Sequence, residues 1–161
     1  ALGQRLRKLL LEEDLFIHPL AELFLYHASR TQHVMERIKP LIKEGVVVIC
    51  DRFMDSTFAY QGYGRGIDWN IIRSLDEISR QGLKPHITFL IDIEPEVGLS
   101  RHSGRNLDRL ERESLDFHRA VREGYLELAR LEPERFRILK GDEPIEHIHS
   151  IILKVVKDLG L

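Results

Sequence analysis

Three apolar runs, separated by segments with helical periodicity, constrain the fold more than any other feature. They are Val46 to Cys50, His86 to Ile91 and Phe136 to Leu139. Val46 to Cys50 is continuous and rich in β-branched residues, which is typical of a strand buried on both faces of a parallel sheet. His86 to Ile91 is expected to be a second buried strand, and Phe136 to Leu139 a short third one. Strands that alternate with helices predict an α/β fold with parallel strands and helices on both faces.

The segments between these runs carry apolar stripes at helical spacing. Proline, glycine and capping residues mark where the expected helices begin and end. Pro40 is expected to kink its helix or to end it early. Residues 52–66 are expected to be a glycine-containing loop with a short helical part. The expected helices are residues 2–11, 20–43, 68–82 and 113–131, with two more opened by Pro95 and Pro144.

Length, charge and cysteine content restrict the class of protein. A chain of 161 residues predicts one domain, residues 1–161. The net charge of −2 gives no basic footprint for nucleic acid. No apolar stretch is long enough to span a membrane. The single cysteine, Cys50, excludes an intrachain disulfide, is expected to be a buried inert thiol, and fits a reducing cytoplasm.

Right-handed crossovers place functional loops at the carboxyl ends of parallel strands. Asp51 and Arg52 follow the first apolar run directly. Arginine can grip a phosphate with two parallel hydrogen bonds, and the aspartate could orient it, accept a hydrogen bond or hold a metal-bound water. An ion pair that simply ends the strand is equally compatible with the position.

Two further groups of residues suit a nucleoside. Ser56, Thr57, Tyr60 and Gln61 supply neutral donors and acceptors, and the glycines beside them permit close approach to a ligand. A flexible surface loop is the alternative. Tyr26 and Arg30, four residues apart, share a helix face and could stack on a base and reach its edge. Taken alone, the two residues favour the alternative of a half-buried tyrosine beside a solvated arginine.

The order of these pieces resembles the thymidylate kinase family. The resemblance covers nearly the whole chain, and its most specific block runs from Asp-Arg-aromatic to Tyr-Gln-Gly-x-Gly-Arg-Gly. The stretches that carry it are LFLYHASR (23–30), CDRF (50–53), DSTFAYQG (55–62), GRG (64–66), KPHITFLID (84–92), PEVGL (95–99), LDRLE (107–111) and GYLELA (124–129).

The resemblance implies an ATP- and Mg²⁺-dependent phosphorylation of dTMP to dTDP for dTTP biosynthesis, on a three-layer P-loop kinase fold. It implies that Tyr26 stacks on thymine where the family usually has Phe, and that Arg30 hydrogen-bonds the thymine edge. Ser56 and Thr57 would line the base pocket, while Tyr60 and Gln61 would form the sugar wall. Asp51 and Arg52 would hold the acceptor phosphate, with Asp51 a possible magnesium contact through water.

The resemblance also assigns residues to the ATP side. Residues 101–109 would be a lid whose Arg101, Arg105 and Arg109 fold over the triphosphate. Arg105 is favoured as the arginine finger, because Gly104 and Asn106 allow movement. An ion pair with Glu111 or Glu113 is an equal alternative for Arg109. Gly141 would lie beside the adenine, although Lys140-Gly141-Asp142 departs from the family's common Asp-Ala.

The 161 residues contain no G-x-x-x-x-G-K-[ST] sequence, which family members carry after their first strand. The chain is therefore expected to be N-terminally truncated, to lack the first P-loop strand, and to be unstable and inactive as an isolated polypeptide. The family further implies a homodimer. Two other functions stay open: another nucleoside or nucleotide kinase of the same class, and a degenerate binding module that lost its P-loop.

Overall fold

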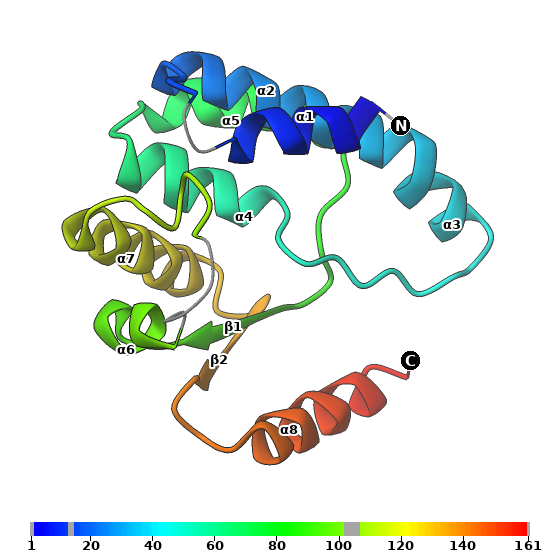
Figure 1. The fold of residues 1–161 in the computed structure, drawn as a ribbon. Helices are drawn as coiled ribbons and strands as arrows, with labels where there is room; N and C mark the ends of the chain where they lie inside the picture. The colour runs from blue at the N-terminus through cyan, green and yellow to red at the C-terminus, as the bar shows by residue number, and fades with distance from the viewer. Residues whose placement is uncertain (1, 13–14, 102–106, 161) are drawn as a thin grey trace.

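The computed structural model describes residues 2–12, 15–101 and 107–160. Eight α-helices, two π-helical segments and two strands are assigned within these residues. Figure 1 shows a helical layer of α1, α2 and α5 on one side of the molecule, with the strands toward the other. Within the described part, no helix is both long and apolar enough to cross a membrane.

The sheet consists of two parallel strands. Strand β1 spans Thr88–Asp92 and pairs with β2, Phe136–Lys140, in a register that aligns Thr88 with Phe136 and Asp92 with Lys140. Two of the three expected strands are therefore present: β1 begins two residues later and ends one residue later than expected, and β2 begins as expected and ends one residue later. The outer helices α6, Pro95–Ser100, and α7, Leu115–Leu131, lie on one side of the strands, and α8, Ile145–Asp158, lies on the other (Figure 1).

The expected strand at Val46 to Cys50 is wrong. This segment pairs with neither β1 nor β2, and it is assigned no regular structure. Its side chains are also exposed rather than buried, since Ile49 is 95% exposed. A strand exists only where a neighbour completes its hydrogen-bond ladder, and the described residues supply none here. Cys50 is exposed as well, which corrects the expectation of a buried thiol.

The first half of the chain is almost entirely helical. Helix α1 covers Leu2–Leu11 and packs on α2, Pro19–His33. The helix continues beyond α2 through a π-helical segment η1, Val34–Ile38, into α3, Lys39–Lys43. Pro40 does not end the helix early, because it lies in the first turn of α3 and the helix continues to Lys43. A proline has no N–H for the ladder, and the widened π turn comes directly before α3.

The segment expected as a loop is mostly helix. Helix α4, Met54–Thr57, runs into a π-helical segment η2, Phe58–Gly64. Helix α5, Trp69–Arg80, follows, with Asp68 accepting the Asn70 N–H at 2.7 Å as the expected cap. Its end is formed by Gln81 and Gly82, both with positive φ.

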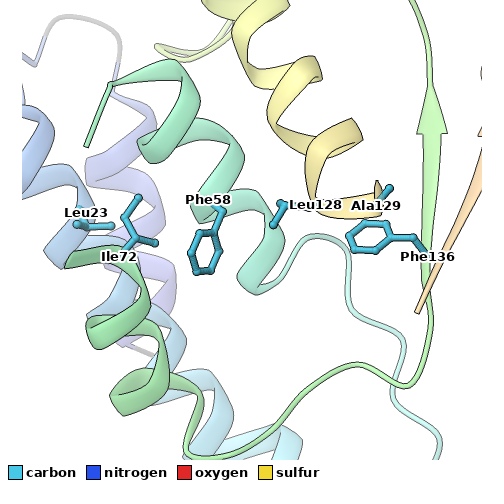
Figure 2. Close-up of a cluster of buried hydrophobic side chains, with 6 residues drawn as sticks. All are labelled: Leu23, Phe58, Ile72, Leu128, Ala129 and Phe136. Carbon is cyan, nitrogen blue, oxygen red and sulfur yellow. The ribbon is translucent and has the colours of Figure 1, made fainter. Parts of the chain in front are cut away.

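The core joins these helices to the sheet. Leu23, Ile72 and Phe58 form a cluster that continues to Leu128, Ala129 and Phe136 (Figure 2). A second cluster lies between η2 and α7 and contains Ala59, Leu110, Phe117 and Val121. The two clusters fix η2 between α2 and α7, and this position decides where its polar residues point.

Candidate functional site

A cavity of about 750 Å³ lies between α1, α2, the segment 50–53, η2 and the segment 108–111. Every residue that sequence reasoning assigned to the acceptor nucleotide lines it. These residues, brought from three separate parts of the chain, are Tyr26, Arg30, Asp51, Arg52, Ser56, Thr57, Tyr60 and Gln61.

Arg30 is held rigidly at the wall of this cavity. Its Nη1 donates to Asp76 Oδ1 at 3.0 Å, and its Nη2 donates to the Phe53 carbonyl at 3.0 Å and to Thr57 Oγ1. The guanidinium side chain is 9% exposed, so the solvated alternative does not apply. A buried arginine fixed on several sides is a preorganised donor for a planar ligand.

His27 lies directly behind Arg30 on α2. Its Nδ1 is 2.8 Å from Ser79 Oγ, and within the described residues its buried Nε2 has no hydrogen-bond partner. Burial, together with the positive charge of Arg30, lowers the pKa of His27 to about 4. The imidazole is therefore neutral near pH 7 and adds no second charge beside Arg30.

Arg52 has an unusual backbone. Its φ of 63° lies in the left-handed region, where a non-glycine residue is strained. Its Nη2 donates to the Tyr60 hydroxyl at 2.9 Å, and its guanidinium lies 4.8 Å from the centre of the Tyr60 ring. Strained residues cluster at ligand sites. Asp51, next to it, is exposed and also faces the cavity.

The aromatic side of the cavity is formed by the half-buried rings of Tyr26 and Tyr60. Burial is the main reason that the pKa of Tyr26 rises to about 12. Ser56 Oγ is 2.6 Å from the hydroxyl of Tyr125, whose pKa is also raised by burial. Tyr60 contacts the Phe117 ring edge to face, with the centroids 6.0 Å apart.

Sequence reasoning missed two buried carboxylates that support this wall. Glu22 accepts a hydrogen bond from Gln61, and Asp76 holds Arg30. The signal for Glu22 was present, because Glu22, Tyr26 and Arg30 follow one another at intervals of four on α2. Asp76 is on α5, and no local pattern pairs it with Arg30.

The expected ATP-side residues are only partly brought together. Arg101 Nη1 donates to the Gly141 carbonyl at 3.0 Å, so these two residues meet. Arg109 pairs instead with Glu22, and it also donates to the Leu10 carbonyl at 3.0 Å. Glu113, one of its expected partners, pairs with Arg65. Arg105 lies outside the described residues.

Within the described part of the chain, protein side chains alone form no cluster of magnesium ligands. Among residues 2–12, 15–101 and 107–160, no three His, Cys, Asp or Glu side chains gather as ligands. Magnesium usually keeps several waters and takes one or two carboxylates together with substrate phosphates. A single carboxylate such as Asp51 fits that pattern.

The fold is that of an α/β phosphotransferase, with a parallel sheet flanked by helices and a polar cavity beside Asp51 and Arg52. A family model described as "Thymidylate kinase" matches residues 1–152. The chain belongs to the thymidylate kinase family, whose members are phosphotransferases that take dTMP and ATP as substrates.

Individual relatives agree with this assignment. A thymidylate kinase of Carboxydothermus hydrogenoformans is 52% identical over 149 residues, which are 92% of this chain and 72% of the relative. One from Synechococcus sp. is 53% identical over 147 residues, covering 91% and 70% respectively. The crystal structure of thymidylate kinase from Ehrlichia chaffeensis superposes with a TM-score of 0.76 at 32% identity, covering 96% of this chain and 72% of that one.

Proposed function

We propose that the cavity of this chain is the dTMP site of a reaction in which ATP and dTMP give ADP and dTDP. The observation that carries the proposal is the convergence of α2, the segment 50–53 and the α4–η2 segment on one cavity. Helix α2 supplies a stacking ring and a fixed hydrogen-bond donor. The segment 50–53 supplies a phosphate-binding pair, and the α4–η2 segment supplies a neutral wall for the sugar.

Thymine is neutral and planar, so it is bound by stacking and by hydrogen bonds. We assign the stacking surface to Tyr26 and the edge contact to Arg30. Arg30 is already fixed by Asp76, Phe53 and Thr57, so little side-chain entropy is lost when the base binds. Ser56 and Thr57 complete the base pocket.

The acceptor phosphate is assigned to Arg52, with Asp51 beside it. Phosphoryl transfer needs mainly positioning and neutralisation of charge, which a fixed guanidinium supplies. The bond between Arg52 and the Tyr60 hydroxyl joins the phosphate side to the sugar wall of Tyr60 and Gln61. Magnesium, when bound, would neutralise the transferred phosphate, and Asp51 would hold one of its waters.

On the ATP side, Arg101 and Gly141 are the described candidates, supported by the hydrogen bond between them. Arg105 is retained as the proposed finger. Arg109 is the weakest of the three lid candidates, because its guanidinium is engaged by Glu22. A homodimer is proposed from the family and from Leu20 and Phe24 on α2, two apolar side chains that are about half exposed. Sedimentation velocity of the chain would test it.

A nucleotide panel tests the proposal. Titration calorimetry with dTMP, dUMP, dCMP and thymidine should give the tightest binding for dTMP, and Arg30→Ala should weaken it at least tenfold. Equal affinity for dUMP or dCMP would favour the second candidate, another nucleotide kinase of the same class. Absence of dTMP binding to the folded chain would reject the assignment of this cavity.

A further inference from the structure

Glu22 is a completely buried carboxylate that lies one helical turn before Tyr26 on α2. Its exposed fraction is 0%. An ionised carboxylate in such a place is costly unless several donors surround it. The donors that surround Glu22 come from two parts of the chain that are remote from each other in sequence.

The first group of donors belongs to η2 and its end. Gln61 Nε2 donates to Glu22 Oε1 at 2.8 Å, and Arg65 donates through Nε and Nη2 at 3.3 Å. Arg65 is fixed in turn by Glu113 at 2.6 Å and by the Phe117 ring, whose centre is 4.7 Å from the guanidinium carbon.

The second donor is Arg109, whose Nη2 donates to Glu22 Oε2. The Arg109 side chain is 11% exposed, so this ion pair is shielded from solvent. The charges of the group balance, with two carboxylates, Glu22 and Glu113, and two guanidiniums, Arg65 and Arg109. Burial by itself would raise the pKa of Glu22, but the hydrogen bonds from Gln61, Arg109 and Arg65 outweigh it and the net pKa is lowered.

Both remote parts are walls of the same cavity. Gln61 lines it from η2, while Asp108, Leu110 and Glu111, the neighbours of Arg109, line it from a separate segment. Glu22 itself does not line the cavity. It therefore acts on the ligand only through the residues that it holds.

We propose that Glu22 is a positioning residue that sets the separation between the η2 wall and the 107–111 wall of the dTMP cavity. The identity of the ligand, dTMP, rests on the proposed function, whereas the contacts of Glu22 do not depend on it. If the two walls are held by one carboxylate, loosening it lets both move, and the fit to the nucleotide is lost. A purely structural role would instead lower stability and leave affinity in the folded protein unchanged.

The test is Glu22→Gln, which keeps the shape and removes the charge. At low temperature, where the variant is verified to be folded by circular dichroism, we expect the Kd for dTMP to rise at least tenfold. Arg109→Gln should do the same, and it serves as the test if Glu22→Gln does not fold. Because Glu22 and Arg109 act through each other, their effects should not add. The Kd for dTMP of the double variant should be no higher than that of whichever single variant binds dTMP more weakly.

Arg135→Gln is the matched control. Arg135 is 6% exposed, forms a 2.6 Å ion pair with Asp55, and does not line the cavity. It should lower the melting temperature and leave the Kd for dTMP within twofold of wild type. An unchanged Kd in both Glu22→Gln and Arg109→Gln, or an equal loss in Arg135→Gln, would overturn the inference.

Hydrogen exchange separates this inference from the proposed function. Amides of residues 107–113 and 58–65 should exchange faster in Glu22→Gln than in wild type, and those in Arg135→Gln should not. If wild type fails to bind dTMP, the proposed function is rejected. The positioning role of Glu22 is then tested by hydrogen exchange alone. Unchanged exchange in both segments would reject its positioning role.

Discussion

At the scale of single residues, the cavity depends on side chains that are fixed before any ligand arrives. Arg30 is the clearest case, because two of the side chains that accept its hydrogen bonds, Asp76 and Thr57, are buried. Asp76 also accepts from Arg80 Nε at 2.9 Å. One carboxylate of α5 therefore holds two guanidiniums in place, and one of these, that of Arg30, lines the cavity.

Neutralising this carboxylate should affect both stability and binding. In Asp76→Asn, we expect the free energy of unfolding to fall by about 3–5 kcal/mol, because a buried guanidinium loses its charged partner. The Kd for dTMP should rise as well, since Arg30 is no longer fixed. Urea unfolding and titration calorimetry measure the two effects.

The control for that variant is Glu77→Gln, the same change of charge at the next position of α5. Glu77 is exposed. Its substitution should change the free energy of unfolding by less than about 0.5 kcal/mol. Similar losses in the two variants would contradict the role given to Asp76.

His27 predicts a pH dependence of stability. Its pKa of about 4 in the folded protein lies below the ordinary value of 6.5, so the unfolded chain binds a proton more readily between these values. The stability that neutral His27 contributes is complete above about pH 6.5 and is lost as the pH falls toward 4. The whole effect amounts to about 3 kcal/mol.

Comparison of wild type with His27→Asn in urea unfolding at several pH values isolates this contribution. Other groups, including Glu22, titrate in both proteins, so only the difference between the two curves is attributed to His27. The variant should lose less stability than wild type between about pH 7 and about pH 4.5. Parallel losses would show that the folded-state pKa of His27 is not lowered.

At the scale of elements, the close approach of α7 to η2 holds the aromatic wall in place. Gly124 of α7 makes this approach possible. A Cβ at this position would lie 2.8 Å from Tyr63 Cδ2 and 3.0 Å from the backbone Cα of Ala59. Since Ala59 is completely buried in η2, that backbone atom has no space into which it could move.

Gly124→Ala should therefore destabilise the protein by about 1–3 kcal/mol, although alanine ordinarily favours a helix. Gly98→Ala in α6 is the matched control, because a Cβ there meets only Ile93 Cγ2 at 3.5 Å. It should be neutral or stabilising by up to about 1 kcal/mol. Thermal denaturation distinguishes the two, and equal effects would contradict the packing argument.

At the scale of the whole molecule, the described residues build the cavity proposed for dTMP but no phosphate-binding loop of the Walker type. The 161 residues contain no G-x-x-x-x-G-K-[ST] sequence. Apolar side chains around the sheet are exposed, including Val47 at 54%, Ile91 at 51% and Ile138 at 53%. Binding of dTMP and transfer of a phosphoryl group from ATP to dTMP can therefore be tested separately in this chain.

The 161-residue polypeptide should bind dTMP but form no ADP at a steady rate from dTMP, ATP and Mg²⁺. The physical reason is that backbone amides and a lysine that hold the ATP phosphates are supplied by the loop that these residues lack. A coupled assay of ADP formation checks this, with the thymidylate kinase of Carboxydothermus hydrogenoformans as the positive control. Steady turnover by the polypeptide would contradict the prediction.

The sequence by itself predicted most of the helices, the two paired strands and eight of the residues that line the cavity. Periodicity, prolines and caps are local signals, and Asp68 caps α5 as they predict. The extended Val46 to Cys50 segment was misjudged, because a strand needs a neighbour that local sequence cannot show. The helical η2 was expected as a loop, since its glycines indicate flexibility until α7 packs against them.

Only the tertiary structure decided which charges meet. Arg30 and Asp76 are 46 residues apart, and Arg109 is 87 residues from Glu22. No periodicity relates residues so far apart. The sequence also contains other arginines with which each carboxylate could have paired. Their pairing depends on tertiary packing, which brings α5 and the segment 107–111 to α2 and buries these groups where an unpaired charge would be too costly.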